Sequence, residues 1–139
     1  MIILDTNVVS EPLKPSGNPV VESWLDQQVA ETLYLTATSL AELRTGVEFL
    51  PNGNRKDVLK EALSQLLAGL FTGRILAFDE KAANAYAGLV SRARSAGRAL
   101  SVADAQIAAI AIVHGFTVAT RDTAPFMAAG VPIINPWGA

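Results

Sequence analysis

The sequence predicts an α/β fold in which a roughly five-stranded, mostly parallel sheet is flanked by helices on both faces. Three observations support this prediction. Short apolar runs of strand length alternate with longer segments of helical periodicity. Each connection between successive strands contains a helix, as a parallel connection requires. No tight Asn-Gly turn joins two strand runs, which excludes most antiparallel architectures.

The first strand is expected at Ile2–Leu4, an unbroken apolar run typical of a strand buried on both faces. A short helical segment follows it and ends at Lys14. Asn18 and Pro19 are a typical N-cap and first-turn proline, so a second helix should begin there. Its apolar face is expected to carry Val20, Val21, Trp24 and Leu25. Leu33–Leu35 is the second expected strand.

Two helices are expected before the third strand. The first begins at Thr38-Ser39 and runs to about residue 50, where Pro51-Asn-Gly closes it. The second runs from about residue 57 to Phe71, and Gly73 stops it. The apolar run 75–78 is the third strand.

The remaining elements follow clear helix signals. Asp79 should cap an alanine-rich helix that runs to about Ala96, and Ser101 should cap a helix that ends at Gly115. The chain then continues with a strand at 116–120, a short helix at 123–129 and a strand at 131–134. Because Pro132 cannot donate a hydrogen bond to a neighbouring strand, the last strand should lie at an edge of the sheet.

Composition favours a single compact domain over residues 1–139. Half of the residues are hydrophobic and 17% are charged, which excludes intrinsic disorder. The chain has no cysteine, so disulfides, thiolate metal ligands and a cysteine nucleophile are excluded. The N-terminus lacks the features of a signal peptide, and the apolar stretch 105–113 is too short to cross a bilayer. We therefore expect a cytoplasmic protein without a membrane partner.

Four acidic residues are expected at one edge of the sheet. Asp5 ends the first strand, Glu42 follows the second strand, Asp104 lies in the first turn of the Ser101-capped helix, and Asp122 follows the strand 116–120. Ligands of open parallel sheets bind beyond the carboxyl ends of the strands, where these acids should meet. The four positions therefore define a candidate site.

Each acid also has a structural explanation. Ser39-Leu-Ala-Glu42 has the spacing of a capping box, and the helix dipole favours an acid such as Asp104 in a first turn. Asp122 fits an ordinary turn or cap. Asp5 is the hardest to explain in this way, and the coincidence of four acids favours a functional site over four separate caps.

A cation would account for this convergence. Two carboxylates about 4 Å apart repel each other by about 4 kcal/mol at an effective dielectric constant of about 20. Carboxylates without histidine or cysteine select hard cations, Mg²⁺ or Mn²⁺. Such ions typically act on phosphates, where they activate water and stabilise the leaving oxygen. The acids therefore predict metal-dependent phosphodiester hydrolysis.

The residues around the acids also resemble a known family. The relevant segments are Ile3-Leu-Asp5-Thr-Asn7, Ser39-Leu-Ala-Glu42-Leu, Asp104-Ala-Gln-Ile-Ala-Ala109, Thr120-Arg-Asp122 with Phe126, and Ile134-Asn-Pro-Trp137. In this order they resemble the PIN-domain ribonucleases and, within that family, the VapC/FitB-type toxins of type II toxin–antitoxin systems. The resemblance covers the whole chain.

The resemblance implies an endoribonuclease with Mg²⁺ or Mn²⁺ held mainly by Asp5 and Asp104. Glu42 and Asp122 would complete the metal site, partly through water. Thr120 matches a small hydroxyl position that would hold a metal-bound or attacking water, although an ordinary threonine at a strand end is equally compatible with the sequence. Asn7 would either orient Asp5 or cap the first helix. The resemblance also implies a homodimer and a cognate antitoxin whose C-terminal segment covers the active site.

Trp24 and Trp137 are candidates for apolar patches that a partner covers, although a tryptophan on a helical apolar stripe is more often part of the core.

The net charge is −2, but if four of the thirteen acids belong to a metal site, the eleven basic residues outnumber the nine remaining acidic residues. These bases cluster at Arg55, Lys56 and Lys60 and at Arg92, Arg94 and Arg98. The arginines are candidates for phosphate contacts, although such residues usually form a solvated face.

Three other functions remain open at this stage. RNase H-like nucleases also use four acids, but their fold opens with antiparallel hairpins. Haloacid-dehalogenase-like phosphotransferases begin with an Asp at a strand end, but their second Asp corresponds to Asn7. A non-catalytic binding or scaffold domain would use the acids only as helix caps.

Overall fold

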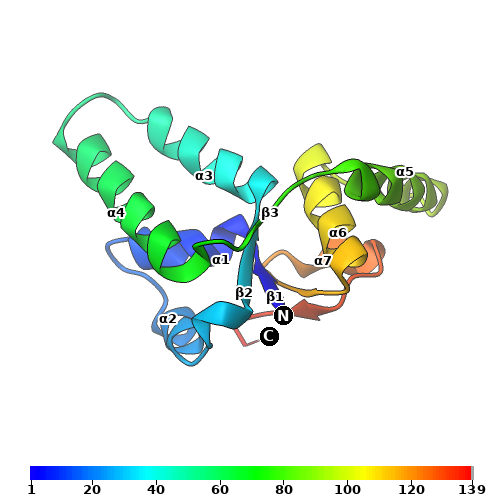
Figure 1. Ribbon diagram of the computed structural model, residues 1–139, viewed down its shortest axis with the longest axis horizontal. Helices are drawn as coiled ribbons and strands as arrows, with labels where there is room; N and C mark the ends of the chain where they lie inside the picture. The colour runs from blue at the N-terminus through cyan, green and yellow to red at the C-terminus, as the bar shows by residue number, and fades with distance from the viewer. Residues whose placement is uncertain (139) are drawn as a thin grey trace.

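The computed structural model describes residues 1–138, which contain five strands, seven α-helices and two short 3-10 helices. In chain order the elements are β1 (Ile2–Leu4), α1 (Thr6–Ser10), η1 (Glu11–Leu13), α2 (Pro19–Asp26), η2 (Ala30–Thr32), β2 (Leu33–Thr36), α3 (Ala37–Glu48), α4 (Asn54–Phe71), β3 (Ile75–Leu76), α5 (Glu80–Ser95), α6 (Val102–His114), β4 (Thr117–Ala119), α7 (Thr123–Ala128) and β5 (Ile133–Ile134). The strands form one parallel sheet in the order β3-β2-β1-β4-β5. The predicted fold class is confirmed (Figure 1).

Helices cover both faces of this sheet, as the apolar strands predict. On one face, α5, α6 and α7 pack on Ile3 and Val118. On the other face, α1 to α4 pack on Leu4 and Ala119. Ile3 and Leu4 are both fully buried, so successive side chains of the central strand enter opposite cores. Figure 1 shows these two helical layers on either side of the strands.

The pairing of β1 with β4 determines where the candidate site residues emerge. Leu4 pairs with Ala119, and the Asp5 N–H donates a hydrogen bond to the Ala119 carbonyl at 2.9 Å. Asp5 and Thr120 are therefore the next residues on two adjacent parallel strands. They lie at the carboxyl edge of the sheet, where ligands of such folds bind.

Helix α3 begins earlier than predicted because Thr36, and not Thr38 or Ser39, is its N-cap. The Thr36 hydroxyl oxygen accepts a hydrogen bond from the Ser39 N–H at 3.0 Å, and Ser39 is buried within the first turn. The helix also ends at Glu48 instead of near residue 50, and α4 begins at Asn54 instead of near residue 57.

The edge strands are shorter than predicted. Pro132 has no N–H to donate, so β5 is reduced to Ile133–Ile134, although the Pro132 carbonyl still accepts from the Val118 N–H at 2.9 Å. The predicted edge position of this strand is confirmed. At the opposite edge, Phe78 leaves the sheet and packs edge-on against Tyr86 of α5, with 5.8 Å between ring centroids. Strand β3 therefore ends at Leu76.

The prediction that Val20 joins the buried face of α2 is wrong. Val20 is 56% exposed, whereas Val21 and Leu25 are buried. Trp24 and Trp137 are both partly buried and pack against the core on the α1 to α4 side of the sheet, so they do not form exposed apolar patches.

None of the helices in residues 1–138 has the length and hydrophobicity needed to cross a bilayer.

Candidate active site

The centre of the candidate site is a buried carboxylate paired with a buried hydroxyl. The Thr120 hydroxyl donates a hydrogen bond to Asp5 Oδ2 at 2.8 Å, and the Thr6 N–H donates to Asp5 Oδ1 at 2.8 Å. Asp5 is 6% exposed and Thr120 is fully buried. Both carboxylate oxygens therefore have protein partners, which hold the carboxyl group in one orientation.

Thr120 and Asn7 connect this pair to the loop that carries Asp122. The Asp122 N–H donates to the Thr120 hydroxyl oxygen at 3.1 Å. Asn7 Nδ2 lies 3.5 Å from the same oxygen, and Asn7 Oδ1 accepts from the Arg121 N–H at 3.3 Å. Asp5, and not Asn7, is the N-cap of α1, so the acid that was expected to be hardest to explain by capping does cap a helix. Of the two roles considered for Asn7, capping is therefore excluded, and its role in orienting Asp5 stays a prediction.

Glu42 does not form the capping box that its spacing from Ser39 suggests. Thr36 caps α3, and the Ser39 hydroxyl oxygen accepts from the Thr36 hydroxyl at 3.2 Å. Glu42 Oε1 instead accepts from the Thr6 hydroxyl at 3.0 Å. Because Thr6 is the residue whose N–H also binds Asp5, this hydrogen bond joins Glu42 to the central pair.

Asp104 and Asp122 differ in how far their positions are explained by capping. The Ser101 hydroxyl oxygen accepts from the Asp104 N–H at 3.1 Å, so the predicted N-cap of α6 is confirmed. Asp104 is half-buried. Asp122 is exposed and occupies the N-cap position of α7, but its side chain makes no capping hydrogen bond. Capping therefore does not account for the Asp122 carboxylate.

The electrostatics of Asp5 show which acids lie near it. Burial raises the pKa of the Asp5 carboxyl above its ordinary value of 3.8, and the charges of Asp104 and Glu42 raise it further. The hydrogen bonds from Thr120 and Thr6 oppose this rise. The structure therefore brings the charges of Asp104 and Glu42 close enough to Asp5 to affect its pKa.

The donor chemistry of these side chains fits a hard divalent cation, since every candidate ligand is a carboxylate or hydroxyl oxygen. A cation would also relieve the repulsion that raises the pKa of Asp5. Within residues 1–138, however, no three acidic or histidine side chains are close enough together to hold a metal ion as they stand. The four-carboxylate metal site thus stays a prediction.

The sequence matches the PIN domain family over residues 2–130. The chain belongs to the PIN-domain family. Three curated relatives support the assignment. They are the plasmid stability protein StbB of Pseudomonas syringae pv. tomato (52% identity, 100% of both chains), toxin FitB of Neisseria gonorrhoeae (53%, 99% of both chains) and VapC ribonuclease Y4jK of Sinorhizobium fredii (47%, 99% of this chain and 98% of the relative).

Two solved structures are similar to this chain over its whole length. The FitAcB crystal structure from Neisseria gonorrhoeae has a TM-score of 0.95 and 52% identity, covering 100% of both chains. FitAB bound to an IR36 DNA fragment also has a TM-score of 0.95, with 50% identity over 100% of this chain and 97% of the other. The PIN fold of this protein is therefore established by both sequence and structure.

Three hollows flank the acids of this PIN domain. The first is an apolar groove of about 480 Å³ between α1, η1 and the α3–α4 pair, with Thr6 and Glu42 in its lining. The second, of about 490 Å³, lies between α3 and α6 and is also lined by Glu42. The third, of about 290 Å³, is lined by Asp122 and Arg98 among others. The site is thus open on several sides.

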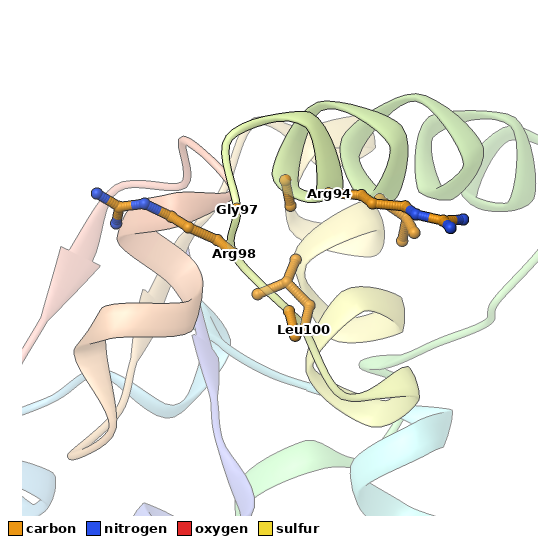
Figure 2. Close-up of a pocket in the computed structure, with 7 residues that line it drawn as sticks. Arg94, Gly97, Arg98 and Leu100 are labelled. Atoms are coloured by element: carbon orange, nitrogen blue, oxygen red, sulfur yellow. The ribbon is translucent and has the colours of Figure 1, made fainter.

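The two basic clusters of the PIN domain differ in their surroundings. Lys56 and Lys60 lie 3.7 and 3.1 Å from the Glu48 carboxylate, so that cluster is partly neutralised. No arginine forms an ion pair within residues 1–138. Figure 2 shows Arg98 pointing toward α7 and Arg94 pointing the opposite way along α5. Of the three arginines in this segment, Arg98 alone lines a hollow together with Asp122.

The sequence alone did not identify two contacts of this PIN-domain site. The Thr6 hydroxyl holds Glu42, and the Thr38 hydroxyl donates to Gln106 Oε1 at 2.9 Å, joining α3 to α6. Thr6 directly follows Asp5, and Thr38 lies four positions before Glu42 on α3. No spacing rule identifies them, because each contact links residues far apart in the chain.

Proposed function

We propose that this PIN-domain protein is a Mg²⁺- or Mn²⁺-dependent endoribonuclease and the toxin of a toxin–antitoxin pair. The observation that carries the proposal is the buried Asp5 carboxylate, oriented by Thr120 and Thr6 and facing the charges of Asp104 and Glu42. The names of two relatives, toxin FitB and VapC ribonuclease Y4jK, support this reading. A scaffold domain needs its acids only as caps; Asp5 does cap α1, but Glu42 and Asp122 do not cap.

Asp5 and Asp104 would hold the metal directly, and Glu42 and Asp122 would complete the site, partly through water. The bound cation would polarise the phosphodiester and lower the pKa of a water molecule. Thr120 uses its only proton on Asp5, so its role is to hold that carboxylate in place. Glu42 and Asp122 are exposed, so their side chains can turn toward a bound cation.

The decisive experiment is cleavage of a mixed RNA pool by the purified protein. We expect cleavage with Mg²⁺ or Mn²⁺ and none in EDTA. Asp5→Asn and Asp104→Asn should abolish cleavage while the circular dichroism spectrum stays unchanged. Asp26→Asn, which removes an exposed acid of α2, is the matched control and should retain activity. Full activity in EDTA, or in both site variants, would contradict the proposed metal site.

The proposed antitoxin partner fits the apolar groove. Leu59, Leu63 and Val47 line this groove, and Glu42 lies at its contact with the candidate site. A partner segment with apolar anchors would fill the groove and cover Glu42. The product of a small neighbouring reading frame should inhibit cleavage, and Leu59→Asp should weaken that inhibition without changing cleavage by the free protein. Inhibition that is insensitive to Leu59→Asp would remove the groove from the proposal.

The homodimer that the family resemblance implies also belongs to this proposal. Large apolar side chains outside the groove, including Val102 and Ile112 of α6, are exposed. Burying such side chains is the usual driving force for self-association. Light scattering coupled to size-exclusion chromatography should give twice the chain mass, and a monomer at all concentrations would contradict it.

A further inference from the structure

We propose that the hollow between α3 and α6 binds a nucleobase of the RNA next to the cleaved bond, and this inference rests on the proposed ribonuclease function. The hollow, called the α3–α6 hollow below, has a volume of about 490 Å³. Its lining residues are Thr38, Ala41, Glu42, Thr45, Gly46, Phe49 and Gln106. Because Glu42 belongs both to this lining and to the candidate active site, a group bound here is a direct neighbour of the reacting phosphate.

Phe49 offers a stacking surface at the rim of the α3–α6 hollow. It is the C-cap residue of α3 and is 83% exposed, the highest value among the exposed large apolar side chains in residues 1–138. A flat ligand stacked on this exposed ring would remove apolar surface from water, which favours binding. Proteins that bind single-stranded RNA use such rings as platforms for unpaired bases.

Gln106 offers an oriented polar group in the same hollow. The Thr38 hydroxyl donates to Gln106 Oε1 at 2.9 Å, which fixes the side-chain amide and engages its oxygen. The Nε2 amino group retains its two N–H donors for a ligand. A base edge with carbonyl acceptors, such as uracil or guanine, matches these donors better than adenine, which presents its own amino group.

Gly46 leaves the wall of the α3–α6 hollow open. A glycine inside a helix destabilises it relative to alanine. A Cβ atom at Gly46 would meet nothing within 4 Å, so packing within this chain does not require the glycine. The open space lets a ligand approach the backbone of α3 here, both in the α3–α6 hollow and in the apolar groove that Gly46 also lines.

The charge of the lining favours a base over a phosphate. Glu42 is the only charged residue among the described residues that line the α3–α6 hollow. An anionic carboxylate repels phosphate, whereas an uncharged base can stack and form hydrogen bonds there. The RNA backbone would therefore pass over the acids, and one base would turn into the hollow.

The test measures RNA binding in an Asp5→Asn background, which cannot cleave under the proposed function. Fluorescence anisotropy with short single-stranded oligo-U and oligo-A, in the presence of Mg²⁺, should show tighter binding of oligo-U. Gln106→Glu keeps the acceptor for Thr38 but removes both N–H donors, so it should abolish the preference for oligo-U. Gln65→Glu adds the same charge on an exposed face of α4 and should leave the preference unchanged.

Two further variants separate binding from folding. Phe49→Ala should lower the affinity for both oligonucleotides about tenfold. Val58→Ala, which removes an exposed apolar side chain of α4, should leave both affinities unchanged. Gly46→Ala and Gly69→Ala both fill open space inside a helix, so both should raise the melting temperature. Only Gly46→Ala should weaken RNA binding, since Gly69 does not line the hollow.

The outcomes distinguish this inference from the proposed function. If the wild type cleaves RNA but affinity and base preference are unchanged in the Gln106, Phe49 and Gly46 variants, the inference is overturned and the ribonuclease stands. If these variants weaken only the binding of the inhibiting partner protein, the α3–α6 hollow is a protein contact and the inference is likewise overturned. If the wild type neither cleaves nor binds RNA, both fail.

Discussion

The two halves of the candidate site contrast in burial and in the number of protein contacts. Asp5 and Thr120 lie at the ends of the central strands β1 and β4, are buried, and are connected by a hydrogen bond of 2.8 Å. Glu42 lies in the second turn of α3, after β2, Asp122 is the N-cap residue of α7, after β4, and both are exposed. Glu42 has one side-chain partner, Thr6, and the Asp122 carboxylate has none within residues 1–138.

This contrast shows which part of the site is formed before any ligand binds. The orientation of Asp5 is determined by the sheet register and by two hydrogen bonds, so it requires little rearrangement on binding. Glu42 and Asp122 can move toward a cation when one binds. We therefore expect substitutions in the buried half to have larger effects than substitutions in the exposed half.

The largest expected effect is that of Asp5→Asn compared with Asp122→Asn. Loss of the central carboxylate should lower kcat/KM for RNA cleavage by about a hundredfold or more, because it removes the proposed main metal ligand. Asp122→Asn should lower it by about tenfold or less, the lower end of the range for groups that support a metal site. Rates measured at several Mg²⁺ concentrations would test this order, and equal losses would show that burial is not what separates the two halves.

Thr120→Val should have the next largest effect. The substitution keeps the shape of the side chain but removes the hydroxyl that binds Asp5 and the Asp122 N–H. Unsatisfied buried groups cost about 1–3 kcal/mol in unfolding free energy, and Mn²⁺ affinity should fall about 10- to 100-fold. Thr120→Ser restores the hydroxyl and should recover most of both losses. Urea unfolding and Mn²⁺ titration measure them, and wild-type Mn²⁺ affinity in Thr120→Val would show that the hydroxyl does not orient the site.

The pH dependence of stability should be smaller but has a definite sign. Burial, followed by the charges of Asp104 and Glu42, raises the pKa of Asp5 in the folded protein above 3.8. The folded state therefore binds the Asp5 proton more tightly than the unfolded state does. The resulting stabilisation is complete below pH 3.8 and is lost as the pH rises through the folded-state pKa.

In EDTA at neutral pH, Asp5→Asn should therefore unfold at a higher urea concentration than the wild type. Adding Mg²⁺ should stabilise only the wild type and reduce or reverse this difference, because only the wild type binds the ion tightly. Urea titrations from acidic to neutral pH provide the measurement. A wild type more stable than Asp5→Asn in EDTA at neutral pH would show that the Asp5 charge is already compensated.

The smallest expected effect is that of replacing Arg98, which lies near Asp122 in the exposed half of the site. Arg98 shares a hollow with Asp122, whereas Arg94 points the other way (Figure 2). Arg98→Ala should raise KM for RNA several-fold and reduce the slope of log affinity against log salt concentration by about one. Arg94→Ala is the matched control and should change neither. Identical behaviour of the two variants would assign both arginines to a solvated face.

The sequence correctly predicted those features of the fold that depend only on residues close together in the chain, such as the ends of helices. Asn18 caps α2, Asp79 caps α5, Ser101 caps α6, and Gly115 ends α6 in a left-handed conformation, all as predicted. The predicted start of α3 was wrong because two residues three positions apart, Thr36 and Ser39, are both suitable N-cap residues. Strand β2 ends at Thr36, and Thr36 is therefore the residue that caps the helix.

The sequence by itself determined the α/β class, the order of the elements and the placement of four acids after strands or in first turns, because periodicity and capping depend on residues close in the chain. Only the tertiary structure decided how these acids differ. The β1–β4 register buries Asp5 beside Thr120, a hydroxyl 115 positions away, and the contact of α3 with α6 joins Thr38 to Gln106. Such contacts depend on how distant elements pack, and no local rule encodes that packing.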